Sequence, residues 1–208
     1  MKNNKKIVSE AIRLENFWNG DFGNRYIERN RVNPRHRADF LYRILKKYPS
    51  QNILEVGCNI GLNIHWLVKK MPQRQVFGLD INEKALRELK KTYPYVNAVY
   101  GTARSLPFRD QYFDLVFTAG VLIHQPPEML PLVMGEIVRC ARKYVLADEY
   151  FAEKLTEVPY RGHRKALFKL DFGKMYQELF PQLLLRETGF LPAKAGWDDF
   201  TYWVFEKP

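Results

Sequence analysis

The fold is decided by the stretch NILEVGCNIGLN at residues 52–63. A short apolar run ends in Glu55 and Val56, a turn containing Gly57 and Gly61 follows, and a helical pattern begins after it. Doubly wound α/β domains build nucleotide sites from this order of strand, glycine turn and helix. Glycine lets the backbone turn tightly, and the first N–H groups of the helix face the ligand. The stretch therefore predicts a nucleotide site at the end of the first strand.

Strand and helix patterns alternate after this turn. The expected strands are 53–56, 75–80, 96–100, 113–118 and 143–147, and the expected helices between them are 62–70, 83–92 and 128–141. This alternation predicts a parallel sheet with helices on both faces and right-handed crossovers. Strand patterns at 183–187 and 201–205 are not separated by a helix, so the last strand is expected to run antiparallel. The predicted fold is an α/β, Rossmann-like, doubly wound, mostly parallel sheet of seven strands in one domain over 1–208.

The composition excludes several classes of protein. Apolar residues make up 46% of the chain, enough for a full core. No apolar run reaches the roughly 18 residues that suggest a membrane helix, and an amphipathic segment rather than an apolar one follows the basic N-terminus, so neither a membrane span nor a signal peptide is expected. Cys58 and Cys140 lack metal-binding spacing, so no metal site is expected and a cytoplasmic protein is the default.

The net charge of +10 is concentrated near the N-terminus. Residues 1–50 hold 12 Lys and Arg against 5 Asp and Glu, whereas 51–150 hold 12 against 10 and 151–208 hold 9 against 8. Such an excess fits a solvated basic face, a small anionic substrate or nucleic acid. The arginines are widely spread and no nucleic-acid-binding motif is present, which disfavours nucleic acid as a partner.

The first 48 residues combine a helical pattern with a dense group of aromatic residues. Apolar spacing over 7–14 indicates an amphipathic helix, and ENFWNGDFGNRY at 15–26 has the aromatics and glycines of a packed loop. Another helix is expected to start at Asn33 and Pro34 and to end near residue 48. The aromatic segment either closes the edge of the core or covers the ligand. We expect a helical lid over 1–48.

The glycine turn lacks the dinucleotide fingerprint G-x-G-x-x-G and has the form E-x-G-x-N-x-G from Glu55 to Gly61. This spacing resembles the first motif of the class I S-adenosylmethionine-dependent methyltransferases. Asn59 replaces a glycine common in that family, and Asn tolerates a left-handed φ better than most residues. Asp80 ends the second expected strand and resembles the acid that holds the cofactor's ribose. The alternative is that Asp80 or Asn82 caps the next helix.

Three later segments resemble the same family in the same order. Thr102 and Ala103 stand where the family often has an acid–alanine pair that reads adenine, so the acid is replaced here, although a backbone N–H could still bind the ring. SLPFRDQYFD at 105–114 resembles a family linker, and TAGVLIH at 118–124 resembles the strand end under the sulfonium. The resemblance implies S-adenosylmethionine as cofactor and S-adenosylhomocysteine as product. The cofactor-binding residues that it implies are Trp18, Tyr26, Glu55, Gly57, Cys58, Asn59, Gly61, Asn63, Asp80, Ile81, Asn82, Thr102, Ala103, Arg104, Thr118, Ala119 and Val121.

His124 is the candidate general base. An unperturbed imidazole has a pKa near 6.5 and accepts a proton from a hydroxyl readily. The alternative is a structural histidine in the loop before the next helix. Methyl transfer from a sulfonium to an acidic acceptor can proceed by alignment and desolvation, without a base.

The acceptor site is expected in segments that the fold does not explain. An insertion over 150–172 carries the basic and aromatic run YRGHRK at 160–165, and DEYF at 148–151 follows the fifth expected strand. Arginines suit a carboxylate or phosphate, and the alternative for these segments is a solvated turn. The residues expected at the acceptor are Phe22, Arg29, Asn30, His124, Glu149, Tyr150, Arg161, His163 and Arg164.

Three segments carry a narrower resemblance. They are FWNGDFGNRYIERN at 17–30, LIHQPPE at 122–128 and YRGHRKALFKLDFG at 160–173, and together they resemble methylases associated with the biosynthesis of pseudaminic acid, an acidic nine-carbon sugar. This resemblance implies methyl transfer, at oxygen rather than nitrogen, to a small anionic acceptor such as an acidic sugar, sugar nucleotide, carboxylate or phosphonate. The alternatives are an RNA or protein methyltransferase that uses the basic N-terminal face, and a non-catalytic S-adenosylmethionine-binding protein.

Overall fold

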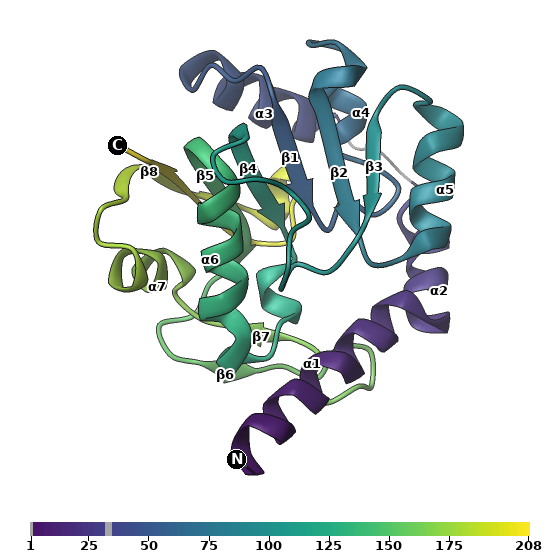
Figure 1. Cartoon of the computed structure of the whole chain (residues 1–208), viewed down its shortest axis with the longest axis vertical. Helices are drawn as coiled ribbons and strands as arrows, with labels where there is room; N and C mark the ends of the chain where they lie inside the picture. Colours follow the sequence, from purple (N-terminus) through teal and green to yellow (C-terminus); the bar gives the residue numbers. More distant parts are fainter. Residues whose placement is uncertain (1, 32–34) are drawn as a thin grey trace.

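A seven-stranded sheet forms the centre of the protein in a computed structural model that describes residues 2–31 and 35–208 (Figure 1). Its strands are β1 Ile53–Val56, β2 Val76–Asp80, β3 Asn97–Tyr100, β4 Phe113–Ala119, β5 Ala141–Tyr150, β8 Leu184–Leu191 and β9 Phe200–Glu206. They lie in the order β3-β2-β1-β4-β5-β9-β8, and β9 alone runs antiparallel to both of its neighbours. This confirms the predicted doubly wound fold.

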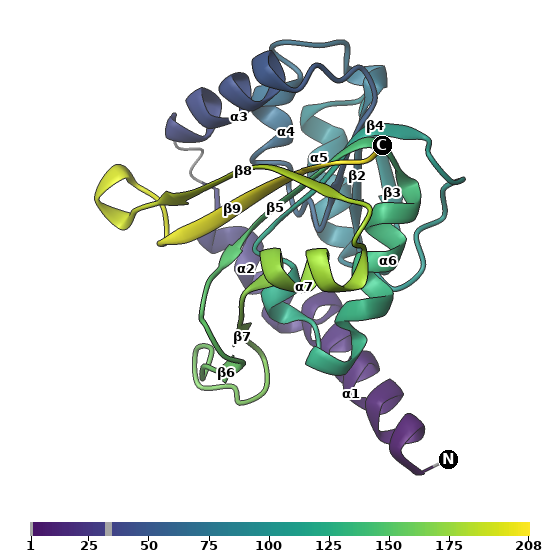
Figure 2. The ribbon, with the colours of Figure 1, turned by 90° about the vertical axis from the view of Figure 1, so that its left-hand side faces the viewer.

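Helices cover both faces of the sheet (Figure 2). They are α1 Lys2–Asn19, α2 Asp21–Arg29, α3 His36–Lys47, α4 Ile64–Leu67, α5 Glu83–Thr92, α6 Leu130–Cys140 and α7 Phe172–Leu179, with short 3-10 turns η1 Gln73–Gln75, η2 Leu122–His124, η3 Pro127–Met129 and η4 Ala193–Ala195. Successive strand residues point to opposite faces. Ile53 accordingly packs in the cluster that includes Leu41 and Leu89, whereas Leu54 packs in the cluster that includes Ile137 and Tyr176.

Several predicted elements differ in length from the observed ones. The α-helical part of the predicted helix 62–70 is only α4, although backbone bonds continue the turns to Lys70. β5 is longer than the predicted 143–147 because it pairs with β9 as far as Tyr150. The strand therefore contains Asp148 and Glu149, which were expected to follow it. The predicted helix start at Asn33 and Pro34 lies outside the described residues, and α3 is described from His36.

The aromatic segment 15–26 is helical, so the prediction of a packed loop is wrong. It spans the end of α1 and most of α2, with a break at Gly20. On either side of this break, the rings of Phe17 and Phe22 stack with centroids 3.9 Å apart. Gly23 makes the close contact possible, because a Cβ there would lie 1.7 Å from the Trp18 carbonyl oxygen. The pair α1–α2 lies across the carboxyl ends of the parallel strands (Figure 1).

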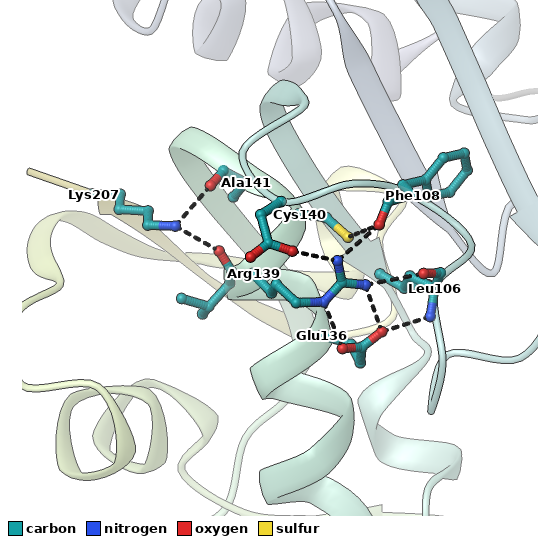
Figure 3. A network of polar contacts seen from close by, with 9 residues as sticks. Leu106, Phe108, Glu136, Arg139, Cys140, Ala141 and Lys207 are labelled. Carbon is teal, nitrogen blue, oxygen red and sulfur yellow. Dashed lines mark hydrogen bonds and ion pairs between the residues drawn. The ribbon is translucent and has the colours of Figure 1, made fainter.

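Arg139 holds the linker between β3 and β4 against α6 (Figure 3). Its guanidinium donates to the carbonyl oxygens of Leu106 and Phe108 at 3.0 and 2.7 Å, and to the carboxylates of Glu136 and Asp110 at 2.7 and 2.8 Å. The hydrogen bonds to Glu136 and Asp110 keep the pKa of Arg139 well above its usual range. This network explains the linker segment 105–114 as a structural element.

Two short strands form a separate hairpin in the insertion after β5. They are β6 Thr156–Glu157 and β7 Phe168–Lys169, which pair antiparallel. The turn between them contains Arg161 and Gly162 at positive φ. No helix in the described parts of the chain is long and apolar enough to span a membrane.

Candidate functional site

A cavity of about 160 Å³ lies at the carboxyl ends of the parallel strands, where doubly wound sheets bind ligands. Its wall takes residues from the ends of β1, β2 and β4, from the chain after β3, and from α1, α2 and α3. The predicted cofactor residues in this wall are Trp18, Tyr26, Glu55, Gly57, Cys58, Asn59, Asn63, Asp80, Ile81, Asn82, Thr102, Ala103, Ala119 and Val121. The wall does not include Gly61, Arg104 or Thr118.

The glycine turn depends on left-handed backbone conformations. Gly57, Asn59 and Gly61 all have positive φ, at 75°, 48° and 81°. The left-handed φ of Asn59 agrees with the tolerance expected of asparagine. A Cβ at Gly57 would lie 2.4 Å from a methyl carbon of Val121, so this position has no space for a side chain. The turn thus needs glycine for two reasons, conformation and close packing.

Asp80 is the last residue of β2, and both oxygens of its carboxylate accept hydrogen bonds from the backbone. One oxygen accepts from the Asn59 N–H and the other from the Asn82 N–H, each at 2.7 Å. Burial raises the pKa of Asp80. The hydrogen bonds from the backbone favour the charged form and oppose this shift, but burial has the larger effect. A carboxylate has about four acceptor positions, so two remain for a ligand. Asn82 caps α5 by accepting from the Ala85 N–H at 2.9 Å, so the alternative that Asp80 is the cap is wrong.

Three polar side chains of the cavity wall are connected by hydrogen bonds. Asn63 donates to Glu55 at 2.7 Å and accepts from Arg37 at 3.2 Å. Burial raises the pKa of Glu55 to about 8, although the Asn63 bond and the Arg37 charge oppose the shift. Arg37 was not predicted, because a lone arginine in a helix belongs to no motif. Its nearest sequence signal was the basic excess of the N-terminal 50 residues.

Four buried polar atoms of the cavity wall have no hydrogen-bond partner among the described residues. They are Trp18 Nε1, Arg37 Nε, Glu55 Oε2 and Asn59 Oδ1. Leaving a buried polar group unpaired is destabilising by about 1–3 kcal/mol, so native proteins seldom do it without a reason. Unpaired donors and acceptors for a polar ligand therefore lie in the same cavity.

Glu15 fastens α1 to the chain that follows β3. Its carboxylate accepts from the Thr102 hydroxyl and from Arg104 Nε and Nη2, the last two at 2.8 and 2.6 Å. Burial raises the pKa of Glu15, but the bonds from Arg104 and Thr102 outweigh it and lower the pKa overall. Glu15 and Thr102 both line the cavity, so this connection belongs to the site. No motif pointed to Glu15, because its partners are 87 and 89 residues away.

His124 also lines the cavity, at the end of η2. Its Nδ1 lies 2.5 Å from the Ala166 carbonyl oxygen, which can only accept, so Nδ1 carries the proton and Nε2 keeps its lone pair. The ring packs on Trp18 and Tyr160, with centroids 4.6 and 4.9 Å away. Burial lowers the pKa of His124 to about 4, so the imidazole is neutral at pH 7.

Among the residues expected at the acceptor, only Asn30 and His124 line the cavity. Glu149 was expected at the acceptor, and this is wrong, because it is fully buried in β5 and lies outside the cavity wall. Its carboxylate accepts from the N–H groups of Val121, Leu122 and Ile123 at 3.1–3.3 Å and so holds η2 in place. The other expected residues outside the wall are Phe22, Arg29, Tyr150, Arg161, His163 and Arg164.

The turn between β6 and β7 packs against the α1–α2 junction. Tyr160 and His163 lie with their rings 5.8 and 5.3 Å from the ring of Phe22. Arg161 and Arg164 are exposed on the same turn, and the guanidinium of Arg29 lies 5.2 Å from the Phe22 ring. Aromatic side chains thus join the α1–α2 junction to the β6–β7 turn, and the arginines of this turn are exposed to solvent. Among the described residues, no group of three His, Cys, Asp or Glu side chains could hold a metal ion.

The fold and the position of this site at the sheet edge are similar to those of class I S-adenosylmethionine-dependent methyltransferases. Residues 53–144 match the family described as methyltransferase domain. An uncharacterized methyltransferase of Synechocystis is 33% identical over 91 residues, 44% of this chain and 42% of that protein. A phthiotriol/phenolphthiotriol dimycocerosates methyltransferase of Mycobacterium tuberculosis is 34% identical over 94 residues, 44% of this chain and 34% of that protein. The matches thus span less than half of the length of these curated relatives.

Solved structures show the same fold over nearly the whole chain. Magnesium protoporphyrin IX methyltransferase of Synechocystis with bound S-adenosylhomocysteine has a TM-score of 0.71 at 14% identity and covers 95% of this chain and 99% of its own. The Burkholderia thailandensis 1,6-didemethyltoxoflavin-N1-methyltransferase has a TM-score of 0.70 at 16% identity, with coverages of 99% and 89%. Both of these structures contain bound S-adenosylhomocysteine.

Proposed function

We propose that this protein transfers a methyl group from S-adenosylmethionine to a small molecule and that the cavity holds the cofactor. The observation that carries the proposal is the set of unpartnered buried atoms on Arg37, Glu55 and Asn59 beside the glycine turn. An amino-acid end with an ammonium and a carboxylate group has the complementary chemistry. Arg37 would hold the carboxylate, and Glu55 and Asn59 would accept from the ammonium group. Bound there, the cofactor supplies an electrophilic methyl group on a sulfonium.

Asp80 would hold the ribose hydroxyls with its two remaining acceptor positions. It lies between the glycine turn and the chain after β3, and its carboxylate is fixed by two backbone N–H groups. A carboxylate held in this way is already oriented before the ligand arrives, which lowers the entropic cost of binding. The fixed turn and the fixed acid together favour one orientation of the cofactor along the sheet edge.

The acceptor would enter on the side of Trp18, Tyr26 and His124, which line the cavity from α1, α2 and η2. Buried aromatic walls exclude water from the reacting atoms. We infer a small anionic acceptor with its reactive hydroxyl inside this wall. Its negative charge would lie outside, toward the exposed Arg161 and Arg164.

His124 would act as the base for a hydroxyl acceptor. Its neutral Nε2 would take the hydroxyl proton as the oxygen–carbon bond forms and the carbon–sulfur bond breaks, which leaves a neutral thioether. A base with a pKa of about 4 is weak, but the proton of an oxygen that is being methylated is strongly acidic. The main contribution of this side chain would then be to orient the hydroxyl.

The structure favours a small acceptor over RNA because the N-terminal basic charge is broken up by ion pairs. Arg13 pairs with Glu10 at 2.7 Å and Arg31 with Glu28 at 2.8 Å. Lys47 pairs with Glu187 at 2.6 Å. RNA binding would show a steep fall in affinity with rising salt, and we expect none.

Calorimetry with S-adenosylhomocysteine tests the cofactor assignment. The wild-type protein is expected to bind it, and Asp80→Ala is expected to weaken binding at least tenfold, as loss of hydrogen bonds to a charged group implies. Turnover is then followed by mass spectrometry with a panel of hydroxylated carboxylates and phosphates. A mass gain of one methyl group supports the enzyme, whereas tight cofactor binding with no product across the panel favours a non-catalytic binding protein.

A further inference from the structure

The side of the cavity next to the chain after β3 combines apolar side chains with one carboxylate. Ala11 and Leu14 of α1 are almost fully buried and line the cavity, as do Ile81 and Ala103. Glu15 is the acidic side chain that α1 adds to the cavity wall. Two apolar side chains and a carboxylate therefore lie on one helix, facing the chain after β3.

The positions of the other polar groups leave the side of the cavity next to the chain after β3 for the nucleobase. Arg37, Glu55 and Asn63 form a connected group on the β1 side, suited to the amino-acid end. Asp80 ends β2, where α/β nucleotide sites bind the ribose. β3 lies next to β2 at the edge of the sheet, so the base continues the same direction.

We propose that Glu15 binds the 6-amino group of adenine and thereby selects an adenine-containing cofactor. This inference rests on the proposed function. A carboxylate only accepts hydrogen bonds, so it suits an amino group and repels a 6-oxo group. The chain after β3 has Thr102 rather than an acid, and the acid comes instead from α1, 87 residues earlier.

The contacts of Glu15 keep its charge and leave room for this bond. Its Oε1 accepts from Thr102 and from Arg104 Nε, while Oε2 has only Arg104 Nη2 at 2.6 Å. A carboxylate oxygen accepts about two hydrogen bonds, so Oε2 retains an acceptor position. The side chains of Glu15 and Arg104 are only 21% and 20% exposed, so water competes weakly for it.

If Glu15 binds adenine, recognition of the nucleobase depends on the position of α1. Because Glu15 belongs to the helix that crosses the sheet edge, an adenine bound to it would hold α1 and the chain after β3 together. A competing account is that Glu15 only fastens α1 and never touches the ligand. The two accounts differ in one measurable quantity, the discrimination between bases.

The test compares S-adenosylhomocysteine with its 6-deamino analogue, in which purine replaces adenine, by calorimetry. Wild type is expected to bind the deamino analogue about tenfold to a hundredfold more weakly, the range for a hydrogen bond to a charged group. In Glu15→Ala this ratio is expected to fall to about one, and in Glu15→Gln, whose amide oxygen still accepts, to an intermediate value. Glu10→Ala is the matched control on the same helix, because Glu10 pairs with Arg13 outside the cavity wall.

Three outcomes overturn the proposal. Equal weakening of both ligands in Glu15→Ala, with the wild-type ratio kept, would show that Glu15 only fastens α1. A wild-type ratio near one would show that nothing reads the amino group. Failure of wild type to bind S-adenosylhomocysteine would remove the proposed function as well, whereas the first two results leave it intact. Glu15→Gln keeps the test open if Glu15→Ala does not fold.

Discussion

The carboxyl edge of the sheet and the covering layer, which consists of α1, α2 and the β6–β7 turn, are built in different ways. At the sheet edge, backbone groups fix the site: Asp80 is held by two N–H groups, and Gly57 and Asn59 have left-handed φ. In the covering layer, α1–α2 and the β6–β7 turn meet through aromatic side chains. Side chains in such a layer can be exchanged without changing the sheet. We infer that the sheet edge, together with Glu15 of α1, sets the cofactor and that the aromatic side chains of the covering layer set the acceptor.

Glycine substitutions give the largest expected contrast between the two regions. Gly57 and Gly162 both have positive φ, but a Cβ at Gly57 would lie 2.4 Å from Val121, whereas one at Gly162 meets no described atom within 4 Å. Gly57→Ala is expected to destabilise the protein by about 3 kcal/mol, from left-handed strain and overpacking together. Gly162→Ala is expected to cost about 1 kcal/mol from strain alone. Urea unfolding measures both, and equal losses would contradict the contrast.

Removal of Arg37 is expected to affect ligand binding more than folding. Arg37→Ala should weaken binding of S-adenosylhomocysteine about a hundredfold, because a charge-assisted hydrogen bond to its carboxylate is lost. Arg35→Ala is the control, since Arg35 is exposed and lies outside the cavity wall. Calorimetry under identical salt gives the ratio. A change of less than threefold for Arg37→Ala would place the carboxylate elsewhere.

The burial of His124 predicts a pH dependence of stability. Its pKa is about 4 in the folded protein and near 6.5 when unfolded, so between these values the unfolded state binds more protons. This contribution to stability is complete above pH 6.5 and is lost as the pH falls toward 4. From pH 7 to pH 5 the loss is about 2 kcal/mol, at 1.36 kcal/mol per unit below 6.5.

His124→Asn isolates this effect, because an asparagine amide can still donate to the Ala166 carbonyl. The variant is expected to lose about 2 kcal/mol less than wild type between pH 7 and pH 5, as the unfolding free energies in urea would show. Other titrating groups are common to both proteins and cancel in the difference. Identical pH profiles would mean that His124 is not a buried neutral imidazole.

The smallest expected effect on stability is in the covering layer. Tyr160→Leu keeps an apolar side chain and removes the ring contacts to Trp18, Phe22 and His124, for an expected loss of about 1 kcal/mol. Binding of S-adenosylhomocysteine should change by less than threefold. Acceptor turnover should fall more than tenfold if the layer positions the acceptor. Unchanged turnover, or a loss of cofactor binding as large as the loss of turnover, would contradict the assignment of the two regions.

Local patterns in the sequence were enough to predict the sheet and its edge. The Glu55–Gly61 spacing, Asp80 and the strand ends depend on neighbouring residues, so the mostly parallel sheet and the position of the site could be predicted from them. Long-range packing decided the rest. Residues 15–26 are helical on both sides of a break at Gly20, and Glu149 was misplaced because β9 pairing extends β5 past it. No local pattern identifies Arg37 or Glu15, whose roles come from contacts with distant elements.

A crystal structure with S-adenosylhomocysteine tests the division between the two regions most directly. The ligand is expected at the sheet edge, with its carboxylate on Arg37, its ribose hydroxyls on Asp80 and its homocysteine portion beside the Gly57 turn. The space in front of its sulfur should be bounded by Trp18 and His124. A ligand seated elsewhere, or one whose ribose and carboxylate contact neither Asp80 nor Arg37, would contradict this account of the site.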